Sequence, residues 1–151
     1  MELKNKVTEE TALQCFGSEF DCSQIVFAHC AEKVGISESD ALKVAAAFGG
    51  GMWRGDTCGA VTGALMAIGA KYGHDTMGDK ATKDAMLAKK AEFEKRFAEM
   101  ALAHGCVICR EILGYDIAVP EEAAKIMEEN LFQKVCAPVV AGACEILDEI
   151  L

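Results

Sequence analysis

The segment from Cys58 to Ala70 limits the fold more than any other, because it is apolar on nearly every side. Its thirteen residues are fewer than the roughly twenty that a membrane-spanning helix needs. The segment therefore predicts a buried helix. Gly59, Gly63 and Ala67 recur every four positions and fall along one line of that helix, where a neighbouring backbone can approach closely. We expect this helix at the centre of the fold.

Helix signals continue through most of the remaining chain. Capping residues, apolar side chains three or four positions apart, and glycine or proline at the ends are typical of helices. Beyond the central segment, these signals place helix starts near Thr8, Asp21, Ser37, Asp79, Cys106, Pro120 and Val139. We expect the longest helix to run from Asp79 to His104, with Lys90–Glu94 and Glu92–Arg96 pairs at the four-residue spacing of helix ion pairs. In the helix after Ser37, the expected buried stripe includes Leu42 and Val44.

Strand signals are missing from the sequence. No segment alternates apolar and polar residues with the two-residue period of a half-buried strand, and no fixed repeat or long linker divides the chain. The predicted fold class is all-α, with about six or seven helices packed around the central helix that is rich in small residues. Residues 1–151 should form a single compact domain, because a chain of this length suits one core.

The charge balance narrows the choice of partners. Fifteen basic against twenty-four acidic residues give a net charge of −9, which disfavours nucleic acid and an anionic membrane face. The N-terminal residues do not resemble a secretory signal, so we expect a cytoplasmic protein. A reducing cytoplasm does not maintain structural disulfides. The eight cysteines are therefore candidates for metal, redox or catalytic chemistry.

Two of these cysteines stand at predicted helix starts. Cys58 follows the expected cap of the central helix, and Cys22 directly follows Asp21. Unpaired backbone N–H groups and the positive end of the helix dipole favour a thiolate in the first turn of a helix. We expect Cys58 to be the most thiolate-like cysteine, with Arg54 adding to the effect.

The other cysteines give weaker signals. Cys106 and Cys109 form a Cys-x-x-Cys pair, which one helix face could present as a dithiol or as two ligands of one metal. Neither a thioredoxin-like context nor a second such pair accompanies it. On local grounds, core packing is the expected role of Cys15, Cys30, Cys136 and Cys144.

Two further features carry no specific motif. The three histidines are scattered, and none pairs with another at the spacing of helical zinc ligands. The glycine-rich loop at 49–55 is neither a P-loop nor a dinucleotide fingerprint. We expect its glycines to permit tight packing beside the central helix. Trp53, within this loop, is expected to be a lid or a partial core residue.

Several segments together resemble one protein family. They are Phe20-Asp21-Cys22-Ser23-Gln24, Phe48-Gly49-Gly50-Gly51, Thr57-Cys58-Gly59-Ala60-Val61-Thr62-Gly63-Ala64, Cys109-Arg110-Glu111-Ile112-Leu113-Gly114 and Cys136. Their order along most of the chain is similar to that of the C-GCAxxG-C-C family, which is named for suspected redox activity. In this chain Cys58 precedes Gly59, whereas the family's name puts the glycine first.

The resemblance implies a functional set of four cysteines, namely Cys22, Cys58, Cys109 and Cys136. It raises Cys136 above its local interpretation as a packing residue. It also implies redox activity, and related helical domains have been linked to iron–sulfur binding. Four separated thiols on a helical scaffold could converge on one pocket.

Three hypotheses follow for the function. In the first, the protein is a thiol/disulfide oxidoreductase in which Cys58 attacks and Cys22 or Cys109 resolves the mixed disulfide. In the second, the four thiolates hold an iron–sulfur cluster or another soft metal in an electron-transfer module. In the third, the chain is a helical interaction domain whose cysteines only pack. The redox partner stays open, and the small-residue helix would also suit a homo-oligomer.

Overall fold

Eight α-helices make up most of the computed structural model, which describes residues 2–151. They are α1 (Glu9–Gly17), α2 (Cys22–Cys30), α3 (Glu38–Ala45), α4 (Gly59–Tyr72), α5 (Lys80–Ala98), α6 (Cys109–Leu113), α7 (Pro120–Glu128) and α8 (Ala137–Ile150). Within this range the β pairing is limited to an isolated bridge between Thr57 and Ile108. The all-α prediction is confirmed. The expected number of about six or seven helices is confirmed too, because seven of the eight helices have at least eight residues and α6 has only five.

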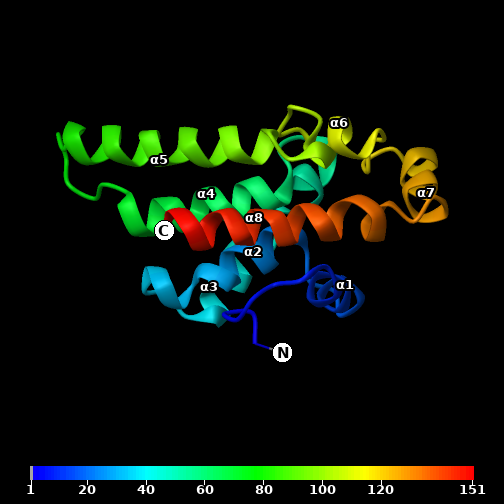
Figure 1. The fold of residues 1–151 in the computed structure, drawn as a ribbon, viewed down its shortest axis with the longest axis horizontal. Coiled ribbons are helices and arrows are strands. Elements are labelled where there is room, and N and C mark those ends of the chain that lie inside the picture. The colour runs from blue at the N-terminus through cyan, green and yellow to red at the C-terminus, as the bar shows by residue number, and fades with distance from the viewer. Residues whose placement is uncertain (1) are drawn as a thin grey trace.

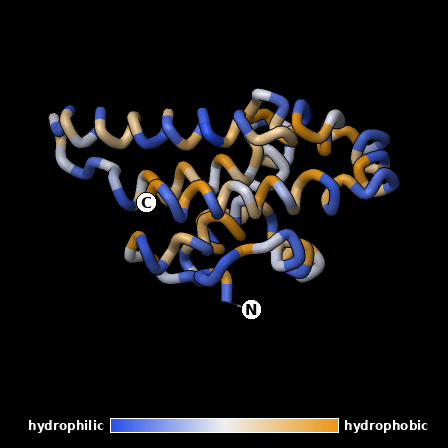
Figure 2. The backbone as a smooth tube through the Cα atoms, in the orientation of Figure 1, coloured by the Kyte–Doolittle hydropathy of each residue, from blue (hydrophilic) through white to orange (hydrophobic). Residues whose placement is uncertain are grey.

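Helix α4 lies at the centre, as predicted. It packs against α2, α5 and α8 (Figure 1). The long helix α5 runs along α8 on one side of the molecule, α1 and α3 lie on the opposite side, and α6 and α7 lie at one end. Hydropathy follows this arrangement in Figure 2, where α5 is hydrophilic along much of its length. Half of the residues of α4, by contrast, are fully buried: Gly59, Ala60, Val61, Gly63, Ala64, Ala67 and Ile68.

The predicted line of small residues brings α4 close to α2. A Cβ atom at Gly63 would lie only 2.5 Å from the carbonyl oxygen of Ser23 and 3.1 Å from its Cα atom. Real Cβ atoms do not approach backbone atoms so closely, so only glycine fits there without moving a helix. The hydroxyl of Ser23 bonds α3 instead, because it donates to the carbonyl oxygen of Ala45, 2.8 Å away.

The long helix is shorter than predicted. Helix α5 ends at Ala98 instead of His104, and residues 101–103 form a 3-10 turn that His104 closes in the left-handed region, with φ 54°. The predicted Lys90–Glu94 pair forms at 2.7 Å. Arg96, however, bonds Glu149 of α8 instead of its own-helix neighbour. Arg96 thus ties the last turn of α5 to α8, a contact that no periodicity within α5 predicts.

Helix α3 buries a narrower stripe than predicted. Ala41 and Ala45 are fully buried, but Val44 is 58% exposed and Leu42 is only partly covered. This helix is short and lies on the surface against α2, so only one residue per turn reaches the core. Its predicted cap is confirmed, because the Ser37 hydroxyl accepts from the Asp40 amide at 3.0 Å.

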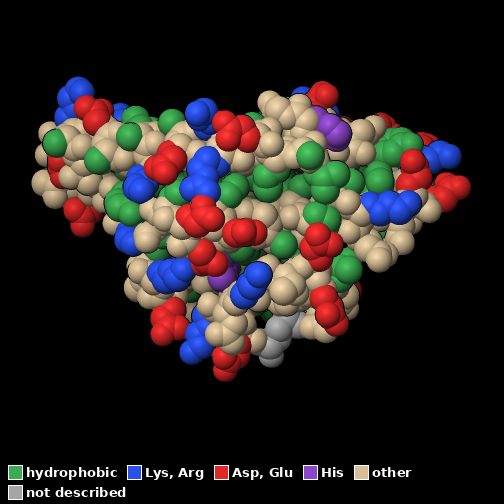
Figure 3. All heavy atoms as spheres, viewed as in Figure 1, with side chains coloured by type: hydrophobic (Ala, Val, Ile, Leu, Met, Phe, Trp, Pro, Cys, Tyr) green, Lys and Arg blue, Asp and Glu red, His purple; other side chains and the backbone are tan. Residues whose placement is uncertain are grey.

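Opposite charges are interspersed on the surface. On the face drawn in Figure 3, acidic and basic side chains alternate, while hydrophobic side chains gather between α5 and α8. No helix among residues 2–151 is both long and apolar enough to cross a membrane.

Buried His29 ties three parts of the chain together. Its Nδ1 lies 2.6 Å from the carbonyl oxygen of Leu3, and its Nε2 lies 2.9 Å from a carboxylate oxygen of Asp148 on α8. Lys33 also donates to Asp148, at 2.6 Å. Burial acts to raise the pKa of Asp148, but the hydrogen bonds from Lys33 and His29 outweigh burial and hold this pKa below its usual range.

The variant Gly63→Ala tests the close contact of α2 and α4. Overpacking against a backbone typically costs about 1–3 kcal/mol, so we expect G63A to lower the free energy of unfolding by that amount. Gly69→Ala is the matched control, because a Cβ atom there would meet nothing within 4 Å. Alanine within a helix is more stable than glycine by about 0.5–1 kcal/mol, so G69A should stabilise. Urea unfolding compares the two variants, and equal effects would contradict the contact.

The variant Asp148→Asn tests the tether through His29. A carboxyl whose pKa is lowered on folding stabilises the protein above its unfolded pKa, and the contribution is lost as the pH falls through the folded value. We expect D148N to be less stable than the wild type near pH 7 by about 1 kcal/mol, because solvent screens this partly exposed pair. The difference should shrink below the ordinary carboxyl pKa of 3.8. Glu145→Gln, an exposed change on the same helix, is the control, and a pH-independent difference would count against the tether.

Candidate functional site

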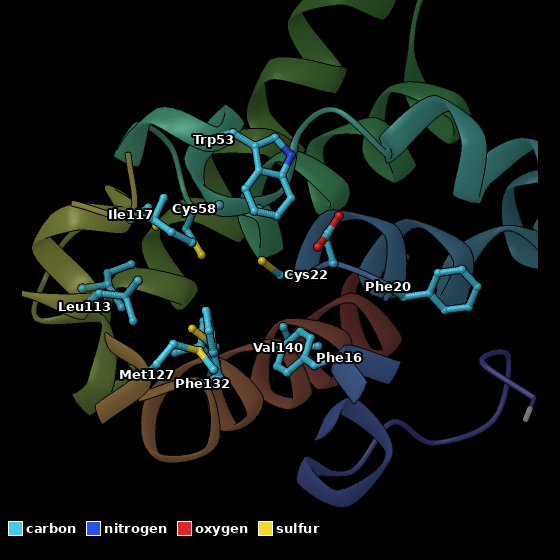
Figure 4. A pocket seen from close by; sticks show the side chains of 17 residues that line it. Phe16, Phe20, Cys22, Trp53, Cys58, Leu113, Ile117, Met127, Phe132 and Val140 are labelled. Atoms are coloured by element: carbon cyan, nitrogen blue, oxygen red, sulfur yellow. The ribbon is translucent and has the colours of Figure 1, made fainter. Parts of the chain in front are cut away.

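An apolar pocket of about 290 Å³ lies at the end of the molecule that carries α6 and α7. Its walls come from the starts of α2, α4, α6 and α8, from α7, and from the loop around Trp53 (Figure 4). The residues that line it are Phe16, Phe20, Asp21, Cys22, Gly50, Trp53, Cys58, Gly59, Cys109, Ile112, Leu113, Ile117, Met127, Phe132, Cys136, Val139 and Val140. Apart from the cysteines, only Asp21 among them is ionisable.

The four cysteines of the predicted set all line this pocket. Cys22 is the first residue of α2, Cys58 is the N-cap of α4, Cys109 is the first residue of α6, and Cys136 lies in the turn before α8. Cys22 and Cys58 point toward each other in Figure 4. The remaining four, Cys15, Cys30, Cys106 and Cys144, lie outside the pocket lining. None of the eight cysteines forms a disulfide.

Close helix packing places Cys22 beside Cys58. A Cβ atom at Gly59, the residue after Cys58, would lie 2.8 Å from the Cys22 sulfur and 3.1 Å from the Ser23 amide nitrogen. The Cys22 sulfur therefore lies over Gly59, the glycine of the Cys-Gly-Ala motif. The contact that sets the fold also sets this pair of thiols.

A short antiparallel contact places Cys109 on the same side as Cys58. Thr57 and Ile108 form the isolated bridge. Around it, the Cys58 amide donates to the Val107 carbonyl at 2.8 Å, and the Cys109 amide donates to the Asp56 carbonyl at 2.6 Å. Because side chains alternate along an extended segment, the residues that follow Thr57 and Ile108 share one face of this bridge. That face is the pocket.

The Cys-x-x-Cys prediction is wrong in its geometry. Cys106 precedes α6, and the chain from Cys106 to Ile108 is extended instead of helical, so Cys106 and Cys109 do not share a helix face. The Cys106 sulfur instead accepts from the Ile108 amide at 3.3 Å. The bridge to Thr57 overrides the local helix signal, because it satisfies backbone groups that a longer helix would have used.

The glycine-rich loop brings Trp53 over the pocket. Gly50, Gly51, Met52 and Trp53 all have positive φ, between 56° and 63°. Such a run is rare, since each non-glycine residue there costs about 1–2 kcal/mol. A Cβ atom at Gly50 would lie 2.9 Å from the Trp53 ring, and one at Gly51 would lie 2.8 Å from the Cβ atom of Cys109. The glycines thus permit tight packing, as predicted, and Trp53 lines the pocket while 49% exposed.

Burial keeps the pocket thiols protonated. It raises the pKa of Cys22 and Cys58, raises that of Cys109 to about 12, and raises that of Cys136 well above its usual value. Backbone N–H groups act in the opposite direction, from Gly50 toward Cys22 and from Ala60 and Val61 toward Cys58, but their effect is smaller. The thiols also raise one another's pKa values, because neighbouring thiolates would repel.

The expectation that Cys58 is poised as a thiolate is therefore wrong for the protein as it stands. The predicted helix-end donors are present, but desolvation of the sulfur of Cys58, a residue that is only 9% exposed, outweighs them. Arg54 does not contribute, because it is 68% exposed and pairs with Asp56 at 2.9 Å. Burial of Asp21 together with the nearby charge of Glu19 raises the pKa of the carboxyl beside Cys22.

Sequence reasoning missed part of the pocket wall. Phe16, Ile117, Met127 and Phe132 carry no motif, and each reaches the pocket from a different element. Met127 is 67% exposed although it lines the pocket, so it marks the mouth together with Trp53. Predicting these residues would have required knowing that α7 and the turn at 132–136 fold back over the start of α4.

The pocket also joins two hydrophobic clusters. Cys58 and Ile112 belong to the main core, and Cys22 packs against it. Cys109, Leu113 and Ile126 form a separate, smaller cluster, against which Cys136 packs. The boundary between the two clusters therefore runs through the pocket, with Cys22 and Cys58 on one side and Cys109 and Cys136 on the other.

The four pocket thiols are the groups that could bind a metal. Thiolates are soft ligands that suit iron–sulfur clusters and zinc. In a zinc site, each thiolate sulfur lies about 2.3 Å from the ion. In residues 2–151, no group of three or more His, Cys, Asp or Glu side chains is arranged to hold one ion. The thiols as placed do not fit a mononuclear site, and the iron–sulfur hypothesis stays a prediction.

The comparisons with known proteins agree with the motif order. Searches of curated proteins and of solved structures found no match. A family model described as "Putative redox-active protein (C_GCAxxG_C_C)" matches residues 20–150, which is most of the chain and includes every cysteine that lines the pocket. The chain therefore belongs to the C_GCAxxG_C_C family.

Proposed function

We propose that this protein is a thiol/disulfide oxidoreductase that works through the cysteines of its apolar pocket. The observation that carries the proposal is that Cys22, Cys58, Cys109 and Cys136 come from four separate segments and line one cavity. Thiol–disulfide chemistry needs a second sulfur within reach of the first, so that a mixed disulfide can be resolved. Cys22 and Cys58 meet this need most directly, because they lie at the starts of α2 and α4, and these two helices are in contact.

The reaction begins with loss of a thiol proton. We assign the attack to Cys58, because the amides of Ala60 and Val61 can stabilise the charge of its sulfur once it forms. The proton can pass to Asp21, the one carboxylate among the lining residues. The Cys58 sulfur then bonds one sulfur of a partner disulfide and releases the other as a thiol. Cys22 attacks the Cys58 sulfur, which forms the Cys22–Cys58 disulfide and releases the second partner thiol.

Raised pKa values make this reaction slow unless the partner is bound. Only the thiolate attacks, and at neutral pH a buried thiol of this kind is almost entirely protonated. Binding in the pocket compensates by holding the reacting sulfurs together. The protein is accordingly expected to discriminate among partners through the pocket instead of reacting with any disulfide in solution.

Disulfide formation provides the main test. Reduced, anaerobic protein is treated with 2-hydroxyethyl disulfide, which is small and uncharged, and the products are mapped by alkylation and peptide mass spectrometry. We expect a Cys22–Cys58 disulfide, which Cys58→Ser and Cys22→Ser abolish and Cys106→Ser leaves intact. Cys106 is the matched control, because it is close to Cys109 in the sequence but does not line the pocket. Four free pocket thiols after treatment would contradict the proposal.

The same preparation tests the iron–sulfur alternative. Anaerobic incubation with iron and sulfide would produce visible charge-transfer absorbance if the four thiolates hold a cluster. Absorbance that each of the four single Cys→Ser variants removes, together with absence of the disulfide, would replace the oxidoreductase proposal with the metal one.

Labelling rates separate an accessible pocket from inert packing. The pocket is open to solvent at Trp53 and Met127, whereas Cys15, Cys30 and Cys144 are at most 1% exposed. We expect N-ethylmaleimide to label the four pocket cysteines at least about tenfold faster than those three, with rates that keep rising at alkaline pH because burial raises the pocket pKa values. Mass spectrometry of timed samples gives the rates. Equal protection of all seven until unfolding would support the packing hypothesis instead.

A further inference from the structure

The size and lining of the pocket restrict what it can bind. An apolar cavity of about 150 Å³ is known to hold benzene, and this one is about 290 Å³. The volume therefore suits two fused rings. Phe16, Phe132 and the only tryptophan of the chain, Trp53, supply aromatic surface for stacking.

The electrostatics of the pocket exclude anions. No Lys, Arg or His lines it, and its one carboxyl, Asp21, would repel a negative ligand. The first amides of α4, which could otherwise bind a phosphate, already face the Cys58 sulfur. Nucleotide cofactors and anionic peptides therefore lack a partner here, whereas an uncharged ring compound needs none.

The thiols place a further condition on an electron acceptor. They are buried and protonated, so oxidation of a pair releases two protons together with two electrons. An acceptor that took only electrons would leave net charge in an apolar pocket, which is costly. A quinone takes two electrons and two protons and becomes a neutral hydroquinone, so the charge in the pocket does not change.

We propose that the pocket binds an uncharged two-ring quinone, which oxidises Cys58 and Cys22. The proposal rests on the redox function proposed above and names a substrate class for it. The Cys58 sulfur bonds a ring carbon as its proton moves to a quinone oxygen. Cys22 then attacks the Cys58 sulfur, the carbon–sulfur bond breaks, and its electron pair stays on the ring. The proton of Cys22 completes the hydroquinone, and the Cys22–Cys58 disulfide remains.

The full chain in reduced, anaerobic form allows a direct test. The probe is 2,3-dimethyl-1,4-naphthoquinone, whose substituted ring carbons cannot keep sulfur as a stable thioether. Binding is measured by quenching of Trp53 fluorescence, and turnover by hydroquinone absorbance and by peptide mapping of the disulfide. We expect quenching that saturates and one hydroquinone per Cys22–Cys58 disulfide.

Two exposed methionines form a matched pair of variants. Met127 lines the mouth and is 67% exposed, whereas Met77 is fully exposed in the turn before α5. Neither change to glutamate should affect folding. We expect Met127→Glu to weaken quinone binding at least about tenfold by placing a charge at an apolar mouth, and Met77→Glu to leave it unchanged. The same quinone with a propanoate group in place of one methyl should bind the wild type as weakly as the neutral quinone binds M127E.

Any one of the following outcomes would overturn the quinone proposal. Quenching without hydroquinone would mean that the pocket binds rings but does not reduce them. Equal binding to M127E and M77E, or equal binding of the charged quinone, would place the site elsewhere. Absence of both quenching and hydroquinone, in protein that still forms the Cys22–Cys58 disulfide with 2-hydroxyethyl disulfide, would reject the quinone and leave the oxidoreductase proposal standing.

Discussion

The contact between the starts of α2 and α4 is the interaction on which the rest of the structure depends. It exists because Gly59 and Gly63 present no side chain to α2, so the two backbones approach to a distance that any Cβ atom would prevent. The core forms around this contact, since α4 also packs on α5 and α8. The same glycine spacing brings Cys22 over the residue next to Cys58. Packing and chemistry are thus specified by one short motif.

Two opposing effects decide the state of the sulfurs. Amides at the helix starts favour the thiolate, and burial in an apolar wall favours the thiol. Burial dominates at Cys58 and Cys22. The pocket can therefore remain free of cations without leaving unpaired charge, and every electron that leaves these thiols must be accompanied by a proton. Redox cysteines that rest as thiolates follow a different rule, because they sit in electropositive, exposed surroundings.

The sequence was most informative where a signal is local. Caps at Thr8, Ser37 and Asp79 and the small-residue line of α4 predicted the helices and their centre, and the motif order predicted the family. Long-range contacts account for the failures. Arg96 bonds α8 instead of its own helix, and the bridge from Thr57 to Ile108 replaces the first turn of a predicted helix. The thiolate prediction for Cys58 failed for a similar reason, because the position of a residue on a helix is visible in a sequence and its burial in the pocket wall is not.

The boundary between the two hydrophobic clusters has a consequence for motion. The smaller cluster contains only three buried side chains, so α7 and the turn at 132–136, which pack against it, can separate from the main core at a lower free energy than the whole domain unfolds. Such breathing would widen the cavity while α2 stays packed on α4. A bond between Cys22 and Cys58 lies on one side of the boundary and leaves the movement free. A bond from either of them to Cys136 would cross it and hold the cavity closed.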